Sequence, residues 1–78
     1  MTSWPPFPQP IGPLRAVNPR TGRTATPGDL VRHLTCGPGT VTGAAWDGLV
    51  GMAVPVVHLD GTPHAHPYVW DVIEFRTP

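Results

Sequence analysis

The side chains best suited to chemistry lie in one short stretch, HLDGTPHAHP, which runs from His58 to Pro67 and holds three of the four histidines and one carboxylate. Imidazoles and carboxylates are ligands that zinc accepts. In an extended segment, His64 and His66 would point to the same side, and His58 or Asp60 would arrive from across a short turn. The stretch is therefore either a metal site or a polar loop between two strands.

A second pair, His33 and Cys36, could complete a tetrahedral ligand set if the fold brings it close to the histidine-rich stretch. The spacing of all these residues matches no established zinc signature. Asp60 and Gly61, followed by prolines, are typical of a turn instead. We therefore expect a connecting loop with no bound metal and no cofactor. If the chain does bind a metal, the candidate ligands are His33, Cys36, His58, His64 and His66.

Nucleophilic catalysis has little support in the sequence. Cys36 has His33 three residues away and Asp29 farther back. A catalytic pair needs hydrogen-bond contact and an oxyanion site inside a pocket, and a domain this small has little room for one. We expect a protein that is not an enzyme.

Length and charge limit the remaining classes of function. A chain of 78 residues forms one domain with a small core, and its single cysteine favours a reducing compartment. Five arginines balance five acids, so no net charge attracts nucleic acid or an acidic surface. No signal peptide or membrane span is visible, which predicts a cytoplasmic location or incorporation in a larger assembly such as a virion. Lysine is absent, a bias that resembles proteins from GC-rich genomes such as those of actinobacteria or their phages.

Residues 1–26 are expected to form an extended, proline-rich arm. Five of the first 13 residues are proline, which fixes backbone φ and biases each preceding residue towards extended geometry. A disordered tail is one interpretation. The other is a clasp that lays apolar side chains on a surface, because solvated tails are usually poor in such residues. The arm carries Trp4, Phe7, Ile11, Leu14 and Val17.

From residue 27 onward the pattern changes to short β-type segments separated by glycine. Strands are expected over residues 28–34, 39–46, 49–59 and 68–75. Asp47 and Gly48 are the strongest hairpin signal, whereas Gly51 and Pro55 predict either a division of the third segment into two strands or an edge position for Pro55. Closing four or five such strands into a barrel would bury one shared core.

The segments PGDLVRH, GPGTVTG and VPVVHLDG together resemble a small SH3-like β-barrel of the KOW or Tudor kind, over residues 27–75. The resemblance implies an all-β fold of four to five short antiparallel strands, which makes residues 27–78 the domain and residues 1–26 its arm. Such barrels serve peptide binding, nucleic-acid binding and assembly alike. Residues 27–78 contain only two of the arginines but all five acids, which favours a protein partner over RNA.

Strand alternation over residues 68–75 would direct Val69, Ile73 and Phe75 to the core and Tyr68 and Trp70 to the other face. Trp70 then either caps the core or lies on a face that a partner covers. We predict a protein-interaction module, with a nucleic-acid-binding barrel as the first alternative and a small metal-binding protein as the second. The expected partner-binding residues are Trp4, Phe7, Ile11, Leu14, Tyr68 and Trp70.

Overall fold

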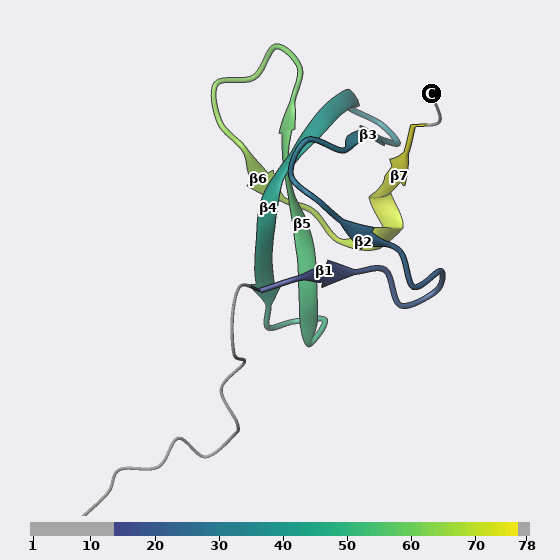
Figure 1. Ribbon diagram of the computed structural model, residues 1–78. Coiled ribbons are helices and arrows are strands. Elements are labelled where there is room, and N and C mark those ends of the chain that lie inside the picture. The colour runs from purple at the N-terminus through teal and green to yellow at the C-terminus, as the bar shows by residue number, and fades with distance from the viewer. Residues whose placement is uncertain (1–13, 77–78) are drawn as a thin grey trace, which may run out of the picture.

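The computed structural model describes residues 14–76, and the regular structure of this part of the chain is almost all antiparallel strand (Figure 1). The predicted all-β class is thus confirmed. The elements are β1 (Ala16–Val17), β2 (Thr24–Ala25), β3 (Leu30–His33), β4 (Gly37–Asp47), β5 (Met52–Leu59), β6 (His66–Pro67), the 3-10 turn η1 (Trp70–Val72) and β7 (Ile73–Phe75). None of the helices in residues 14–76 is long and apolar enough to cross a membrane.

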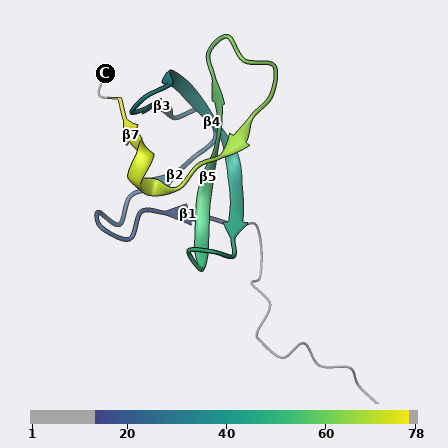
Figure 2. The same cartoon turned by 180° about the vertical axis from the view of Figure 1, so that it is seen from behind.

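The strands form two antiparallel sheets, one of five strands in the order β6-β5-β4-β3-β7 and one of two strands, β1 and β2. Neighbours along the chain pair from β3 to β6, and β7 then returns to pair with β3. The small sheet lies across β4 and β5 (Figures 1 and 2). This arrangement encloses a single core between the two sheets.

β4 is the longest strand and connects the two halves of the large sheet. Its first four residues pair with β3, whereas residues from Gly39 to Asp47 pair with β5. The register shifts between Val41 and Gly43, and such a bulge bends a strand and increases its twist. At the bend, Val41 does not pair with β3. It instead exchanges backbone hydrogen bonds with the segment that precedes β3, donating to Asp29 O (2.9 Å) and accepting from Gly28 N–H (2.8 Å).

Gly39 is fixed by close packing between strands. It pairs with Val31 on one side and with Leu59 on the other. A Cβ at this position would lie 2.8 Å from the carbonyl oxygen of His58 and 2.9 Å from Cγ1 of Val57. The missing side chain therefore lets β4 and β5 approach closely at this position.

β5 continues without a break through Pro55, so the predicted division of residues 49–59 into two strands is wrong. Proline is tolerated where its missing N–H faces an unpaired edge. β6 pairs only with Val56 and Val57. Beside Pro55, the residue that follows β6 supplies one hydrogen bond, from Tyr68 N–H to Pro55 O (3.1 Å). Gly51, with φ of 70°, belongs to the hairpin turn that precedes the strand.

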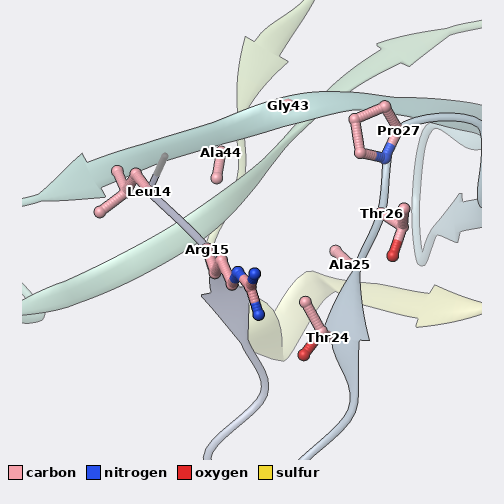
Figure 3. Close-up of a pocket in the computed structure, with 8 residues that line it drawn as sticks. All are labelled: Leu14, Arg15, Thr24, Ala25, Thr26, Pro27, Gly43 and Ala44. Atoms are coloured by element: carbon pink, nitrogen blue, oxygen red, sulfur yellow. The ribbon is translucent and has the colours of Figure 1, made fainter. Parts of the chain in front are cut away.

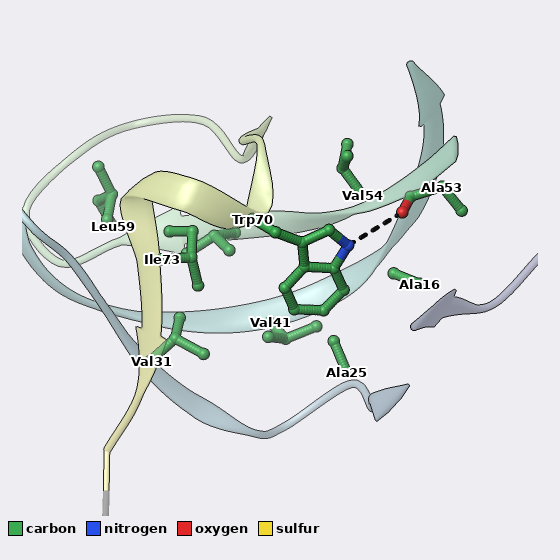
Figure 4. Packing of buried hydrophobic residues seen from close by; sticks show 10 residues of the cluster. Ala16, Ala25, Val31, Val41, Ala53, Val54, Leu59, Trp70 and Ile73 are labelled. Atoms are coloured by element: carbon green, nitrogen blue, oxygen red, sulfur yellow. Dashed lines mark hydrogen bonds between the residues drawn. The ribbon is translucent and has the colours of Figure 1, made fainter. Parts of the chain in front are cut away.

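Residues 68–75 form a strand only over their last three positions, which corrects the expected eight-residue strand. Residues 70–72 instead form the 3-10 turn η1. This turn places the Trp70 ring in the core, where its Nε1–H donates to Ala53 O at 3.2 Å (Figure 4). Tertiary packing of one large side chain thus overrides a strong local β propensity.

The core is made of aliphatic side chains around Trp70, whose exposed fraction is 8%. Val31, Val41 and Val57 are fully buried, and Ile73 is buried as predicted, whereas Phe75 is half-buried. The buried apolar residues are Ala16, Ala25, Val31, Val41, Ala53, Val54, Val57, Leu59, Trp70 and Ile73. Figure 4 shows the alanines of the small sheet against one side of the indole ring.

Residues 14–26, expected to be part of the arm, belong to the folded body. Ala16 and Ala25 pair across the small sheet and are both buried, because small side chains let this hairpin lie directly against the core. Arg20 forms an ion pair with Asp71 of η1, and the Arg23 guanidinium carbon lies 3.7 Å from the centre of the Phe75 ring. The first 13 residues lie outside the described part of the chain.

Candidate interaction surface

The histidine-rich stretch forms the connection between β5 and β6. His58, at the end of β5, donates from Nε2 to the carbonyl oxygen of Thr62 (2.7 Å). The Thr62 hydroxyl in turn donates to Leu59 O at 2.7 Å, so these side chains close the turn at Asp60 and Gly61. His64 and His66 are both exposed. The polar side chains of His58 and Thr62 therefore stabilise the loop in which they lie.

His33 and Cys36 lie in the turn between β3 and β4. The Nδ1 atom of His33 accepts hydrogen bonds from the backbone N–H groups of Thr35 (3.2 Å) and Cys36 (3.1 Å). The His33 ring also contacts Tyr68 edge-on, with centroids 5.0 Å apart. This histidine thus caps its own turn and supports the aromatic ring that follows β6.

The structure does not bring the candidate metal ligands together. Over residues 14–76, no three side chains of His, Cys, Asp or Glu are placed to share a metal ion. Two of the candidate ring nitrogens, on His33 and His58, are engaged with backbone groups of their own turns.

The predicted partner-binding residues have separate fates. Trp4, Phe7 and Ile11 lie outside the described residues, and Leu14 is partly exposed at the first described position. Of the two alternatives for Trp70, the structure shows the core position. Tyr68 is half-buried against the core and His33. Neither Tyr68 nor Trp70 therefore has the exposed face that an eight-residue strand over residues 68–75 would give it.

The exposed aromatic residue of the described body is Trp46, near the end of β4. Its exposed fraction is 63%, and those of Leu49 and Val50 in the following turn are 99% and 44%. We call these three residues the hairpin-end cluster. The turn beneath them is well formed, because the Asp47 carboxylate accepts hydrogen bonds from the N–H groups of Leu49 (2.9 Å) and Val50 (3.3 Å). An ordered turn thus presents apolar side chains to solvent.

Trp46 is not among the partner-binding residues expected from the sequence, and neither are Leu49 and Val50. The available signal was their position directly after the Asp47-Gly48 turn dipeptide, where polar residues are usual in hairpin loops. The predicted hairpin itself is confirmed, with Asp47 paired to Met52 and Gly51 N–H bonded to Asp47 O at 2.8 Å.

A pocket of about 700 Å³ lies between the small sheet and β4 (Figure 3). Leu14 and Arg15 line one end, residues 24–27 line one wall, and Gly43 and Ala44 line the other. Ala44 and Trp46 occupy alternate positions of β4 and so share a face of the strand. We call this hollow the β2–β4 pocket; it extends from Leu14, beside the end of β4, to Pro27 at its other end (Figure 3).

Two ion pairs join charged side chains within residues 14–76. Arg32 and Glu74 are cross-strand partners in β3 and β7, and the Arg32 Nε–H donates to Glu74 Oε1 at 2.9 Å. Arg20 is paired with Asp71, and Arg23 covers Phe75. These contacts are exposed, and they leave the apolar cluster as the chemically distinctive part of the described surface.

Comparison with protein-family models, with curated proteins and with solved structures finds no match for this chain.

Proposed function

We propose that this protein is a non-enzymatic protein-interaction module that binds its partner through the hairpin-end cluster together with residues 1–13, which we call the N-terminal arm from here on. The observation that carries the proposal is the exposure of Trp46, Leu49 and Val50 on an ordered turn. Tryptophan is enriched among the residues that dominate binding energy at protein interfaces. Exposed apolar groups on a rigid support also lose little conformational entropy when a partner covers them.

The proposed fold behind this function is an SH3-like barrel. Three features support it: the strand order in which β7 returns to β3, the bulged β4 shared between β3 and β5, and the 3-10 turn that precedes β7. A bent central strand lets the two ends of a five-stranded sheet face each other across one core. Strands of this kind give the hairpin end a rigid base.

A protein partner is favoured over nucleic acid by the positions of the arginines. Nucleic-acid affinity without sequence preference comes mainly from neutralised phosphates. Arg20 and Arg32 are paired with carboxylates of the same chain, and Arg23 lies over Phe75. If these three arginines bound phosphate instead, their contacts within the chain would be lost. The hairpin-end cluster, in contrast, is already exposed and needs no rearrangement to pack against an apolar surface.

Affinity capture at two ionic strengths tests the proposal. The full chain is immobilised beside two variants, Leu49→Asp in the cluster and Leu34→Asp in the β3–β4 turn, which is an exposed apolar position away from the cluster. We expect one protein to be retained at low and at high salt by the wild type and by Leu34→Asp, and to be lost with Leu49→Asp. Retention of nucleic acid that falls steeply with salt, or equal capture by all three proteins, would contradict the proposal.

A further inference from the structure

The N-terminal arm and the β2–β4 pocket meet at Leu14. This residue is the first that the structure describes, and it lines one end of the pocket. The 13 residues before it carry no charged side chain and include Trp4, Phe7 and Ile11. The pocket lining is mainly apolar and matches this chemistry: aliphatic groups come from Leu14, Ala25, Pro27 and Ala44, beside two threonines and Arg15.

The arm is poorly suited to fill the pocket of its own chain. The pocket begins at the arm's root, so binding in cis would need a complete reversal within the few residues before Leu14. Five prolines among residues 1–13 favour extended backbone instead. At about 3 Å per residue, an extended stretch of seven residues would span roughly 20 Å. A tether that cannot bend to its site gives almost no effective concentration there.

We propose that the β2–β4 pocket is the receptor for the N-terminal arm of a second copy of this chain. This inference rests on the proposed protein-interaction function and names one partner for it. The arm of one copy crosses the pocket of the next, and the exposed ring of Trp46, on the same face of β4 as Ala44, extends the apolar surface it contacts. Each such contact joins one arm to one pocket, so the copies can close into a dimer by reciprocal exchange of arms, close into a larger ring, or extend into an open chain.

Two full-length variants separate the halves of this interface. The arm variant combines Trp4→Ala with Phe7→Ala and keeps the pocket. The pocket variant, Thr24→Arg, places a large charge in the pocket wall from an exposed β2 position and keeps the arm. Leu34→Arg, at an exposed position in the β3–β4 turn, is the matched control for an added arginine. Far-UV circular dichroism and urea midpoints establish that each variant is folded.

Sedimentation velocity over a concentration series gives the readout. We expect the wild type and Leu34→Arg to associate with rising concentration, and each interface variant alone to lose at least about tenfold in self-affinity, as for the loss of one main contact. An equimolar mixture of the arm and pocket variants should form a 1:1 dimer that does not grow, because it contains one intact arm and one intact pocket that fit together.

Three results would overturn the inference: a wild type that stays monomeric at all concentrations, an arm variant that associates as well as the wild type, or folded variants that fail to complement each other. A monomeric wild type that still captures another protein through Leu49 would remove the self-association and leave the proposed function in place. Loss of the salt-insensitive capture, with complementation intact, would restrict the interaction to copies of this chain.

Discussion

Two regions of this molecule contain a tryptophan in or next to a strand, and the side chain is buried in one region and exposed in the other. Around Trp70, the indole is 8% exposed, its N–H is bonded to Ala53 O, and alanines from the small sheet lie against it. Around Trp46, the ring is 63% exposed and stands beside Leu49 and Val50. The first region shows where the chain obtains its stability, and the second shows where an apolar surface persists without contributing to it.

The difference lies in what the neighbouring segments supply. The region of Trp70 is covered by a hairpin whose inward positions are alanines, and small residues leave room for a large ring. In the turn after Trp46, the Asp47 carboxylate accepts hydrogen bonds from two N–H groups. Within residues 14–76, however, the Trp46 ring stays mostly exposed. Folding therefore buries Trp70 and leaves Trp46 exposed, where a partner can contact it.

The replacement Trp70→Ala should produce the largest effect on folding. Removing a buried aromatic side chain costs about 3–5 kcal/mol, a large part of the stability of a small domain. We expect a protein that is unfolded or close to unfolding at 37 °C, measured by urea denaturation. Trp70→Phe keeps most of the volume and loses the bond to Ala53 O, so it should retain the fold with about 1–3 kcal/mol less stability. A Trp70→Ala protein of wild-type stability would break the contrast between the two regions.

The second replacement compares two glycines of β4. Gly39→Ala forces a Cβ to within 3 Å of the neighbouring strand, and overpacking of this kind costs about 1–3 kcal/mol. Gly43→Ala, four residues along the same strand, meets no atom within 4 Å and should be neutral or slightly stabilising. Equal urea midpoints for the two variants would show that the close approach at Gly39 is absent in solution.

The ion pair of Arg20 and Asp71 should matter less. It joins the β1–β2 turn to the helical turn that carries Trp70, but both side chains are more than two-thirds exposed, and exposed pairs contribute about 0.2–1 kcal/mol. A double-mutant cycle with Arg20→Ala and Asp71→Ala should give a small coupling energy that declines as salt rises. A coupling above this range would mean that the small sheet is held mainly by charge and not by Ala16 and Ala25.

The smallest effect is expected at the exposed tryptophan. Trp46→Ala should change the free energy of unfolding by no more than about 0.5 kcal/mol, as for surface positions generally, while partner capture is lost. The urea midpoint and the affinity-capture experiment are measured on the same preparation. A large destabilisation would place Trp46 in the core and remove the basis of the proposed interaction surface.

Much of the sheet could be predicted from the sequence because its signals are local. The β-type segment over residues 28–34 predicted β3, and Asp47-Gly48 predicted the hairpin between β4 and β5. The 3-10 turn at Trp70 and the pairing of Ala16 with Ala25 could not be predicted in this way, since both depend on contacts between segments far apart in the chain. The metal interpretation depended on convergence of His33 with His58, and nothing local in a sequence reports such a distance.

The backbone next to Pro55 has a consequence for how copies of this chain can meet. A protein whose regular structure is nearly all strand risks aggregation through an open sheet edge that pairs with another molecule. On the outer side of β5, the Ala53 and Pro55 carbonyl groups are already bonded to Trp70 and Tyr68, and Pro55 has no N–H to donate. This part of the edge is closed to strand addition, so uncontrolled polymerisation is discouraged at the same time as the far end of the same hairpin remains open for specific contact.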